Sequence, residues 1–187
     1  MDIEENKSAV VLIEFQNQWT CKGLYNWIIK GQLTSRNVVA NTLTLVDEAR
    51  KRGIKIIHAP LIVDPENKRG WLAWLTFGKV FTKDTPKAEI MKGLDRKGDI
   101  HIKGRYAFDA FVGSNLEQVI QENEIETLLI CGFTTDQCVA KTMRTALEKG
   151  FNPYLVSDCT ATMNAFFQWK TERKFRDRVI AYADILN

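Results

Sequence analysis

The chain has 187 residues, of which 45% are hydrophobic and 10% aromatic, so we expect one folded domain over residues 1–187 and exclude a disordered chain. Its 26 Lys and Arg residues nearly balance 23 Asp and Glu residues, and the net charge is only +3. The basic residues are scattered, and no apolar stretch approaches the about 18 residues of a membrane span. We therefore expect neither a nucleic-acid nor a membrane partner.

The cysteines and histidines show no metal-binding or disulfide pattern. The four cysteines are Cys21, Cys131, Cys138 and Cys159, and the two histidines are His58 and His101. No Cys-x-x-Cys spacing occurs, and the histidines lie far apart in the sequence. The polar, acidic N-terminus differs from a secretory signal. Together these features predict no metal or cofactor, and they indicate a reducing, cytoplasmic compartment.

Short apolar runs alternate with helical patterns along the chain. The expected strands cover residues 9–13, 54–58, 99–102, 127–131, 153–156 and 179–182. The expected helices cover residues 37–52, 114–123, 136–149 and 170–176. Because the apolar runs are continuous rather than alternating, the strands are predicted to be buried on both faces of a parallel sheet. The fold class is therefore a three-layer α/β domain, in which the segment 61–98 breaks the alternation and is expected to decorate one end of the sheet.

Three chemically active side chains follow predicted strands. Glu14 follows the first strand, Lys103 the third, and Cys138 lies in the first helical turn after the fourth. Ligands of open α/β sheets bind outside the carboxyl ends of the strands, and a helix N-terminus favours a thiolate. A carboxylate, an ammonium and a thiol can together activate a nucleophile and carry a proton to a leaving group. Taken singly, each also fits a structural or solvated residue.

Other residues leave alternatives open. Cys131 and Cys159 fit structural roles, and a Cys138–His58 dyad is a rival mechanism that requires His58 to point at the thiol. The aromatic cluster of Trp71, Trp74 and Phe77 fits core packing or a stacking wall for a planar ligand.

Three motifs resemble the isochorismatase-like cysteine hydrolases, a family that includes nicotinamidases and other small-amide hydrolases. Residues 131–140, CGFTTDQCVA, are similar to the family's nucleophile segment. Residues 102–111, IKGRYAFDAF, are similar to its lysine segment, and residues 11–19, VLIEFQNQW, to its first strand and acidic residue.

The resemblance implies a six-stranded parallel sheet in the order 3-2-1-4-5-6 and a homo-oligomer. It implies that Cys138 is the nucleophile, that Lys103 lowers the pKa of its thiol, and that Glu14 relays the proton. It further implies a non-proline cis peptide at Phe133–Thr134 and an oxyanion hole formed by the N–H groups of Thr134 and Cys138.

The sequence departs from the family at two places. The acidic residue is Glu14 where the family ordinarily has Asp, and the extra methylene displaces the carboxylate. At the nicotinamidase metal site, Pro60, Ile62 and Lys68 occupy the positions of the ligands, so nicotinamide is a weaker expectation as substrate.

These observations favour a metal-independent hydrolase that cleaves a C–N bond of a small amide through a Cys138 thioester. The expected substrate-binding residues are Gln16, Trp19, Trp71, Trp74, Phe77 and Tyr106. The alternatives are a binding or assembly protein whose chemistry Glu14 has impaired, isochorismatase-type hydrolysis of a non-amide substrate, and a thiol redox sensor.

Overall fold

The computed structural model describes residues 3–64, 66 and 80–186 of the chain. Six parallel strands form one sheet in the order β3-β2-β1-β4-β5-β6, which confirms the predicted topology. The strands are β1 (Ser8–Ile13), β2 (Lys55–Ala59), β3 (Ile100–His101), β4 (Thr127–Phe133), β5 (Asn152–Ala161) and β6 (Val179–Ile180).

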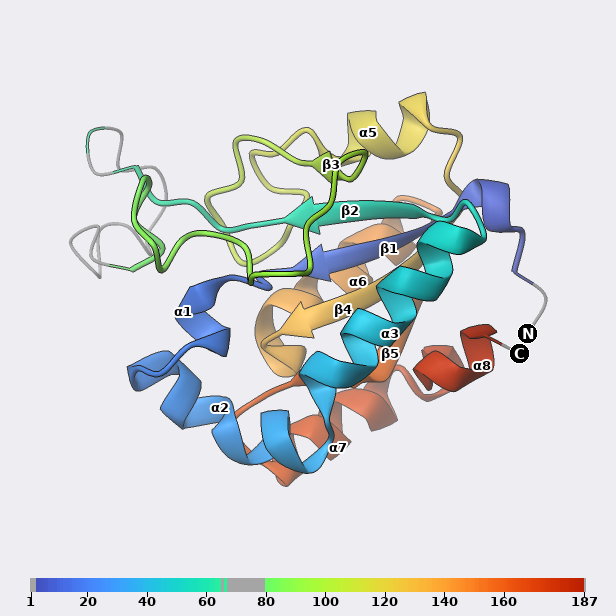
Figure 1. Cartoon of the computed structure of the whole chain (residues 1–187). Helices are drawn as coiled ribbons and strands as arrows, with labels where there is room; N and C mark the ends of the chain where they lie inside the picture. Colours follow the sequence, from blue (N-terminus) through green and yellow to red (C-terminus); the bar gives the residue numbers. More distant parts are fainter. Residues whose placement is uncertain (1–2, 65, 67–79, 187) are drawn as a thin grey trace.

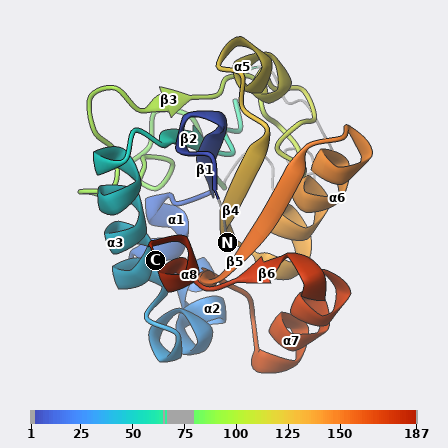
Figure 2. The same ribbon diagram turned by 90° about the vertical axis from the view of Figure 1, so that its right-hand side faces the viewer.

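Helices cover both faces of this sheet (Figures 1 and 2). The helices are α1 (Asn17–Thr20), α2 (Leu24–Ser35), α3 (Val38–Lys51), α5 (Leu116–Glu122), α6 (Ala140–Glu148), α7 (Ala165–Lys174) and α8 (Tyr182–Leu186). Short helical turns η1 (Glu5–Lys7), η2 (Thr135–Val139) and η3 (Arg176–Arg178) complete the regular structure. No helix among the described residues has both the length and the apolar character needed to cross a membrane.

Each face of the sheet has its own apolar core because side chains alternate along each strand. Val10 and Leu12 pack in the cluster that contains residues of α2, α3 and α8. Val11 and Ile13 pack in the other cluster, with residues of α5 and α6. All four side chains are at most 1% exposed, which explains why the first strand is a continuous apolar run.

The predicted elements match the observed ones with a few corrections. The predicted strand over 179–182 is wrong at its end, because Tyr182 begins helix α8. Helix α7 begins at Ala165 rather than near 170, since the Asn164 side chain caps it by accepting a hydrogen bond from the N–H of Phe167. Helices α1 and α2 were not predicted.

The loops after β1 and β4 lie at the carboxyl ends of adjacent central strands. Gly132 permits these strands to approach closely, because its φ is +126° and a Cβ atom there would lie 2.0 Å from the carbonyl oxygen of Ile13. The segments that carry Glu14 and Cys138 are thereby brought side by side.

Candidate active site

Backbone turns direct Glu14 and Cys138 toward each other. Glu14 has a left-handed φ of 56°, an uncommon conformation for a residue with a side chain. Its N–H donates to the carbonyl of Ala59 at 3.2 Å, which ties it to the end of β2. Cys138 lies in the π-helical turn η2, where the N–H of Val139 donates to the carbonyl of Thr134, five residues back. The peptide bond between Phe133 and Thr134 is cis, as the motif implied.

The cation beside Glu14 is Arg105. Its Nη2 atom lies 2.6 Å from Oε1 of Glu14, and both side chains are only 1% exposed. The Nε1 atom of Trp19 donates to the other carboxylate oxygen at 3.0 Å. Although Glu14 has one methylene more than Asp, its carboxylate is held in place from two sides, by Arg105 and by Trp19.

The remaining donors of Arg105 fix the loop around it. Its Nη1 donates to the carbonyl of Ala59 at 2.6 Å, Nε to that of Ala107 at 3.0 Å, and Nη2 also to that of Phe108 at 2.7 Å. A guanidinium has five N–H donors in a planar fork, whereas an ammonium has three on a single nitrogen. Arg105 can therefore hold Glu14 and its own loop at the same time.

Lys103 is not part of this site, which corrects the assignment made from the sequence. Its side chain is exposed and lines a separate surface depression with Asn115 and Gln118. The backbone N–H of Lys103 donates to the Asn115 side chain at 2.7 Å, so the residue helps to anchor the loop that leads to Arg105. The signal that was missed is the second basic residue of the Lys-Gly-Arg motif.

The Cys138 thiol is buried, with 4% of the residue exposed. Burial raises the pKa of this thiol well above its usual range, and the neighbouring Glu14 carboxylate raises it further. The Arg105 charge and a hydrogen bond from the backbone N–H of Thr134 oppose the shift without overcoming it. The direction of this shift is opposite to the lowering that was expected from Lys103, which is not among the groups that act on the thiol.

The nucleophile turn is braced against the Arg105 loop by Thr142. Its hydroxyl donates to the Cys138 carbonyl at 2.8 Å and accepts the N–H of Ala110 at 3.0 Å. Thr135 makes a further link, donating to the Gln168 side chain at 2.8 Å. These bonds position the buried thiol without using its sulfur.

A pocket of about 210 Å³ opens onto the thiol and the carboxylate. Its lining residues are Glu14, Trp19, Tyr25, Phe81, Phe108, Thr134, Gln137 and Cys138. Four of these eight residues are aromatic, and the Trp19 and Tyr25 rings meet edge to face at 5.1 Å. The sequence singled out Trp19 and Thr134 but missed Tyr25 and Phe81, which come from α2 and from the loop before β3.

Several expected pocket residues lie elsewhere. Gln16 is fully buried and its amide bonds only to the backbone of Leu61 and Ala88, so it braces loops rather than binding substrate. Tyr106 lies outside the Cys138 pocket. Trp71, Trp74 and Phe77 lie outside the described residues. The Cys138–His58 dyad is also wrong, because His58 bonds to Asp99 on the other face of the sheet.

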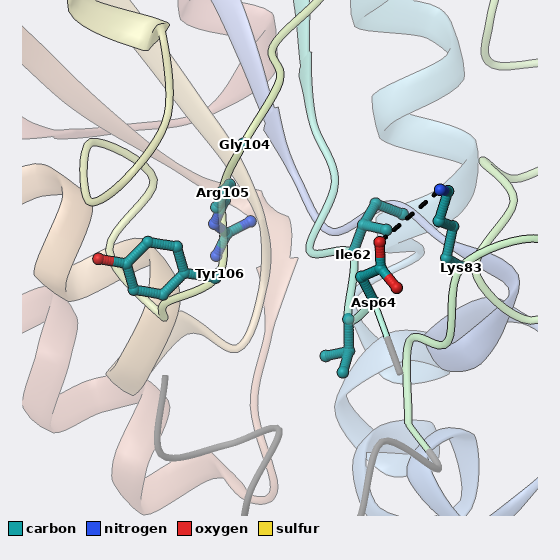
Figure 3. Close-up of a pocket in the computed structure, with 7 residues that line it drawn as sticks. Ile62, Asp64, Lys83, Gly104, Arg105 and Tyr106 are labelled. Carbon is teal, nitrogen blue, oxygen red and sulfur yellow. Dashed lines mark ion pairs between the residues drawn. The ribbon is translucent and has the colours of Figure 1, made fainter. Parts of the chain in front are cut away.

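Tyr106 lines a second pocket of about 240 Å³, together with Arg105. Asp64 and Lys83 lie across it from Arg105 and Tyr106, and their charged atoms are 3.7 Å apart (Figure 3). The sequence resemblance placed the nicotinamidase metal ligands at Pro60, Ile62 and Lys68, near this pocket. Pro60 and Ile62 offer no side-chain ligand there and Lys68 lies outside the described residues, so the described residues do not fit that metal centre.

Comparison with known proteins shows which family the chain belongs to. Residues 8–181 match the Isochorismatase domain. The chain belongs to the isochorismatase family. This confirms the resemblance found in the three motifs, and the chain is accordingly an isochorismatase-family hydrolase.

Individual relatives of the isochorismatase family are distant in sequence and close in fold. The chain is 26% identical to N-carbamoylsarcosine amidase of an Arthrobacter species, over 97% of this chain and 73% of the relative. It is 21% identical to nicotinamidase 3 of Arabidopsis thaliana, over 84% and 74% of the two chains. A cysteine hydrolase from Pseudomonas syringae pv. phaseolicola 1448A superposes with a TM-score of 0.88 at 18% identity, over 100% of this chain and 93% of that one.

Proposed function

We propose that this protein hydrolyses the C–N bond of a small amide through a thioester on Cys138, without a metal ion. The observation that carries the proposal is the buried thiol beside a carboxylate that Arg105 holds at 2.6 Å. The names of two relatives, an amidase and a nicotinamidase, support amide chemistry.

In the first half of the reaction, Glu14 is the general base. As Sγ of Cys138 attacks the amide carbon, the thiol proton passes to the Glu14 carboxylate, so no thiolate accumulates beforehand. The carbonyl oxygen becomes an oxyanion, which we assign to the backbone N–H groups of Thr134 and Cys138. Glu14 then returns its proton to the leaving nitrogen, the C–N bond breaks, and ammonia or an amine departs.

In the second half, water replaces the amine. Glu14 takes a proton from the water as its oxygen attacks the thioester carbon, and the C–S bond breaks. The Cys138 sulfur regains a proton from Glu14, and the acid product leaves. Arg105 keeps the carboxylate in place through both halves and compensates its negative charge whenever Glu14 is ionised.

The pocket favours a small substrate with an apolar or planar body. Its volume of about 210 Å³ lies below the about 300 Å³ at which pockets for drug-sized ligands begin. Arg105, the buried cation behind Glu14, is not among the lining residues and already bonds to Glu14 and to three backbone carbonyls, so it offers little to a substrate carboxylate. Aromatic walls instead suit a neutral ring or short chain.

The test is ammonia release from a panel of neutral primary amides and ureido compounds. We expect turnover of at least one compound by the wild-type chain, and a loss of at least about a hundredfold in Cys138→Ala. A chelator should leave the rate unchanged. Turnover that persists in Cys138→Ala, or that disappears with chelation, would contradict the proposal.

A further inference from the structure

The only two histidines of the chain lie side by side in the sheet. His58 on β2 and His101 on β3 are register partners, and their rings stack at 4.9 Å with an interplanar angle of 21°. The neighbours of His58 in β2, Ile57 and Ala59, pack toward α5 and α6, so the His58 side chain points to the α3 face. The pair is therefore separated by the sheet from Cys138.

A carboxylate completes a three-atom cluster with these rings. Oδ1 of Asp95 lies 3.0 Å from Nε2 of His101 and 3.7 Å from Nε2 of His58, and one possible ligand atom from each residue lies within 4.8 Å of the other two. His58 is buried, whereas the side chains of His101 and Asp95 are 41% and 44% exposed. The cluster is thus buried on the His58 side and open to solvent on the side of His101 and Asp95.

A second carboxylate, that of Asp99, holds the buried His58 ring in place. Oδ2 of Asp99 lies 3.0 Å from Nε2 of His58. Two bonds from the Arg50 guanidinium, at 2.6 and 3.1 Å, and the N–H of Arg96 at 3.0 Å fix Asp99 in turn. Two carboxylates therefore face the imidazoles, and the charge of Asp99 is compensated by Arg50, which leaves the more exposed Asp95 to face an incoming cation.

We propose that His58, His101 and Asp95 form a binding site for a divalent transition metal ion such as Zn²⁺. Two imidazole nitrogens and a carboxylate oxygen are ligands that this ion prefers, and water can take the fourth position. On binding, each neutral ring carries its proton on Nδ1, and the hydrogen bonds between Nε2 and the carboxylates of Asp99 and Asp95 are exchanged for metal coordination. In a tetrahedral Zn²⁺ site, ligand atoms lie about 3.4 Å apart, given metal–ligand distances of about 2.1 Å. The separations of 3.0 and 3.7 Å fall on either side of that value.

A metal ion here would join elements that otherwise have few bonds between them. Strand β3 has only two residues, Ile100 and His101, and pairs with β2 through two register positions. The loop that carries Arg105 begins directly after it. An ion shared by β2, β3 and the loop before β3 would stabilise this edge of the sheet, and none of its three ligands lines the Cys138 pocket, so the site is a structural one.

The test uses the full-length chain, stripped of metal with a chelator and titrated with Zn²⁺ against a chromophoric competitor. We expect one equivalent to bind, and His101→Ala and Asp95→Asn each to weaken it at least tenfold. Both substitutions alter half-exposed side chains, and circular dichroism verifies folding. Asp47→Asn is the matched control, because Asp47 is a comparably exposed carboxylate near Arg50 and Arg96.

Two further readouts distinguish this site from binding by thiols. Co²⁺ should give a visible spectrum typical of nitrogen and oxygen ligands, without a thiolate charge-transfer band. Zn²⁺ should raise the unfolding temperature of the wild type and of Asp47→Asn but not of the His101 and Asp95 variants. Absence of stoichiometric binding, or binding that survives both substitutions, overturns the proposal.

Discussion

The Glu14 carboxylate and the Arg105 guanidinium form a buried ion pair at 2.6 Å. Both charges are removed from water, so each requires the other, and truncation of one partner leaves an uncompensated charge in the pocket wall. The same two groups adjoin the Cys138 thiol and contribute opposite effects on its pKa. Both the proposed proton transfer by Glu14 and the stability of the surrounding loops therefore depend on the Glu14–Arg105 ion pair.

Loss of the Arg105 charge should lower turnover strongly, whereas loss of the Lys103 charge should not. We expect Arg105→Met to lower kcat/KM at least about a hundredfold, since the carboxylate loses its fixed position. Arg105→Lys should retain part of the activity because it preserves the charge. Lys103→Met should stay within about twofold, since that side chain is exposed and outside the pocket. Equal losses in Lys103→Met and Arg105→Met would show that the cation is misassigned.

Alkylation of Cys138 should report its raised pKa. At neutral pH the buried thiol should react with iodoacetamide more slowly than the exposed Cys21, and its rate should still be rising above pH 9. Glu14→Gln should accelerate the reaction, because the carboxylate charge raises the pKa. Peptide mass spectrometry measures both sites in one sample. A rate that reaches its plateau below pH 8 would indicate a preformed thiolate.

Among the elements, the strands were predictable because each is marked by a continuous run of apolar residues in its own short segment of sequence. Continuous apolar runs such as residues 9–13 are buried on both faces, and the order of strands follows from the resemblance. Helix α2 escaped prediction because it buries only Ile29 fully and exposes Leu24 and Trp27, so it shows no apolar stripe.

The site was only partly predictable for a different reason. Glu14 and Cys138 lie at strand ends, where the topology itself brings them together. The role of Arg105 depends on a loop that folds back around its guanidinium, and the pairing of His58 with His101 depends on strand register. Neither arrangement is encoded in spacing along the chain.

Gly132 is the residue on which the approach of β1 and β4 depends. We expect Gly132→Ala to destabilise the protein by at least about 3 kcal/mol, because the added Cβ would meet the Ile13 carbonyl and the positive φ disfavours a side chain. The matched control is Gly31→Ala in helix α2, where a Cβ meets nothing within 4 Å. That change should stabilise by about 0.5–1 kcal/mol. Urea unfolding measures both, and a mild effect at Gly132 would contradict the close approach.

At the scale of the whole molecule, two buried thiols couple stability to alkaline pH. Burial raises the pKa of both Cys131 and Cys138 well above the usual range. Below about pH 8.5 both thiols are protonated whether the chain is folded or unfolded, and their contribution is complete. As the pH rises further, the unfolded thiols ionise first, so the free energy of unfolding falls until the folded pKa is reached.

The loss should reach about 1.4 kcal/mol per pH unit for each thiol. We therefore expect the decline between pH 8.5 and 10 to be shallower in Cys138→Ala than in the wild type, and unchanged in Cys21→Ala, whose thiol is exposed. Urea midpoints at several pH values measure these slopes. A Cys138→Ala slope identical to that of the wild type would be inconsistent with a raised pKa.

The most direct test of the central claim is detection of the acyl-enzyme. A turned-over amide is mixed with the wild-type chain, quenched in acid within the first turnovers, and analysed by intact and peptide mass spectrometry. The proposed mechanism predicts an adduct of the acyl mass on Cys138, with Cys21, Cys131 and Cys159 unmodified, and no adduct in Cys138→Ala. Turnover without any adduct on Cys138, or an adduct that forms equally on another residue, would contradict it.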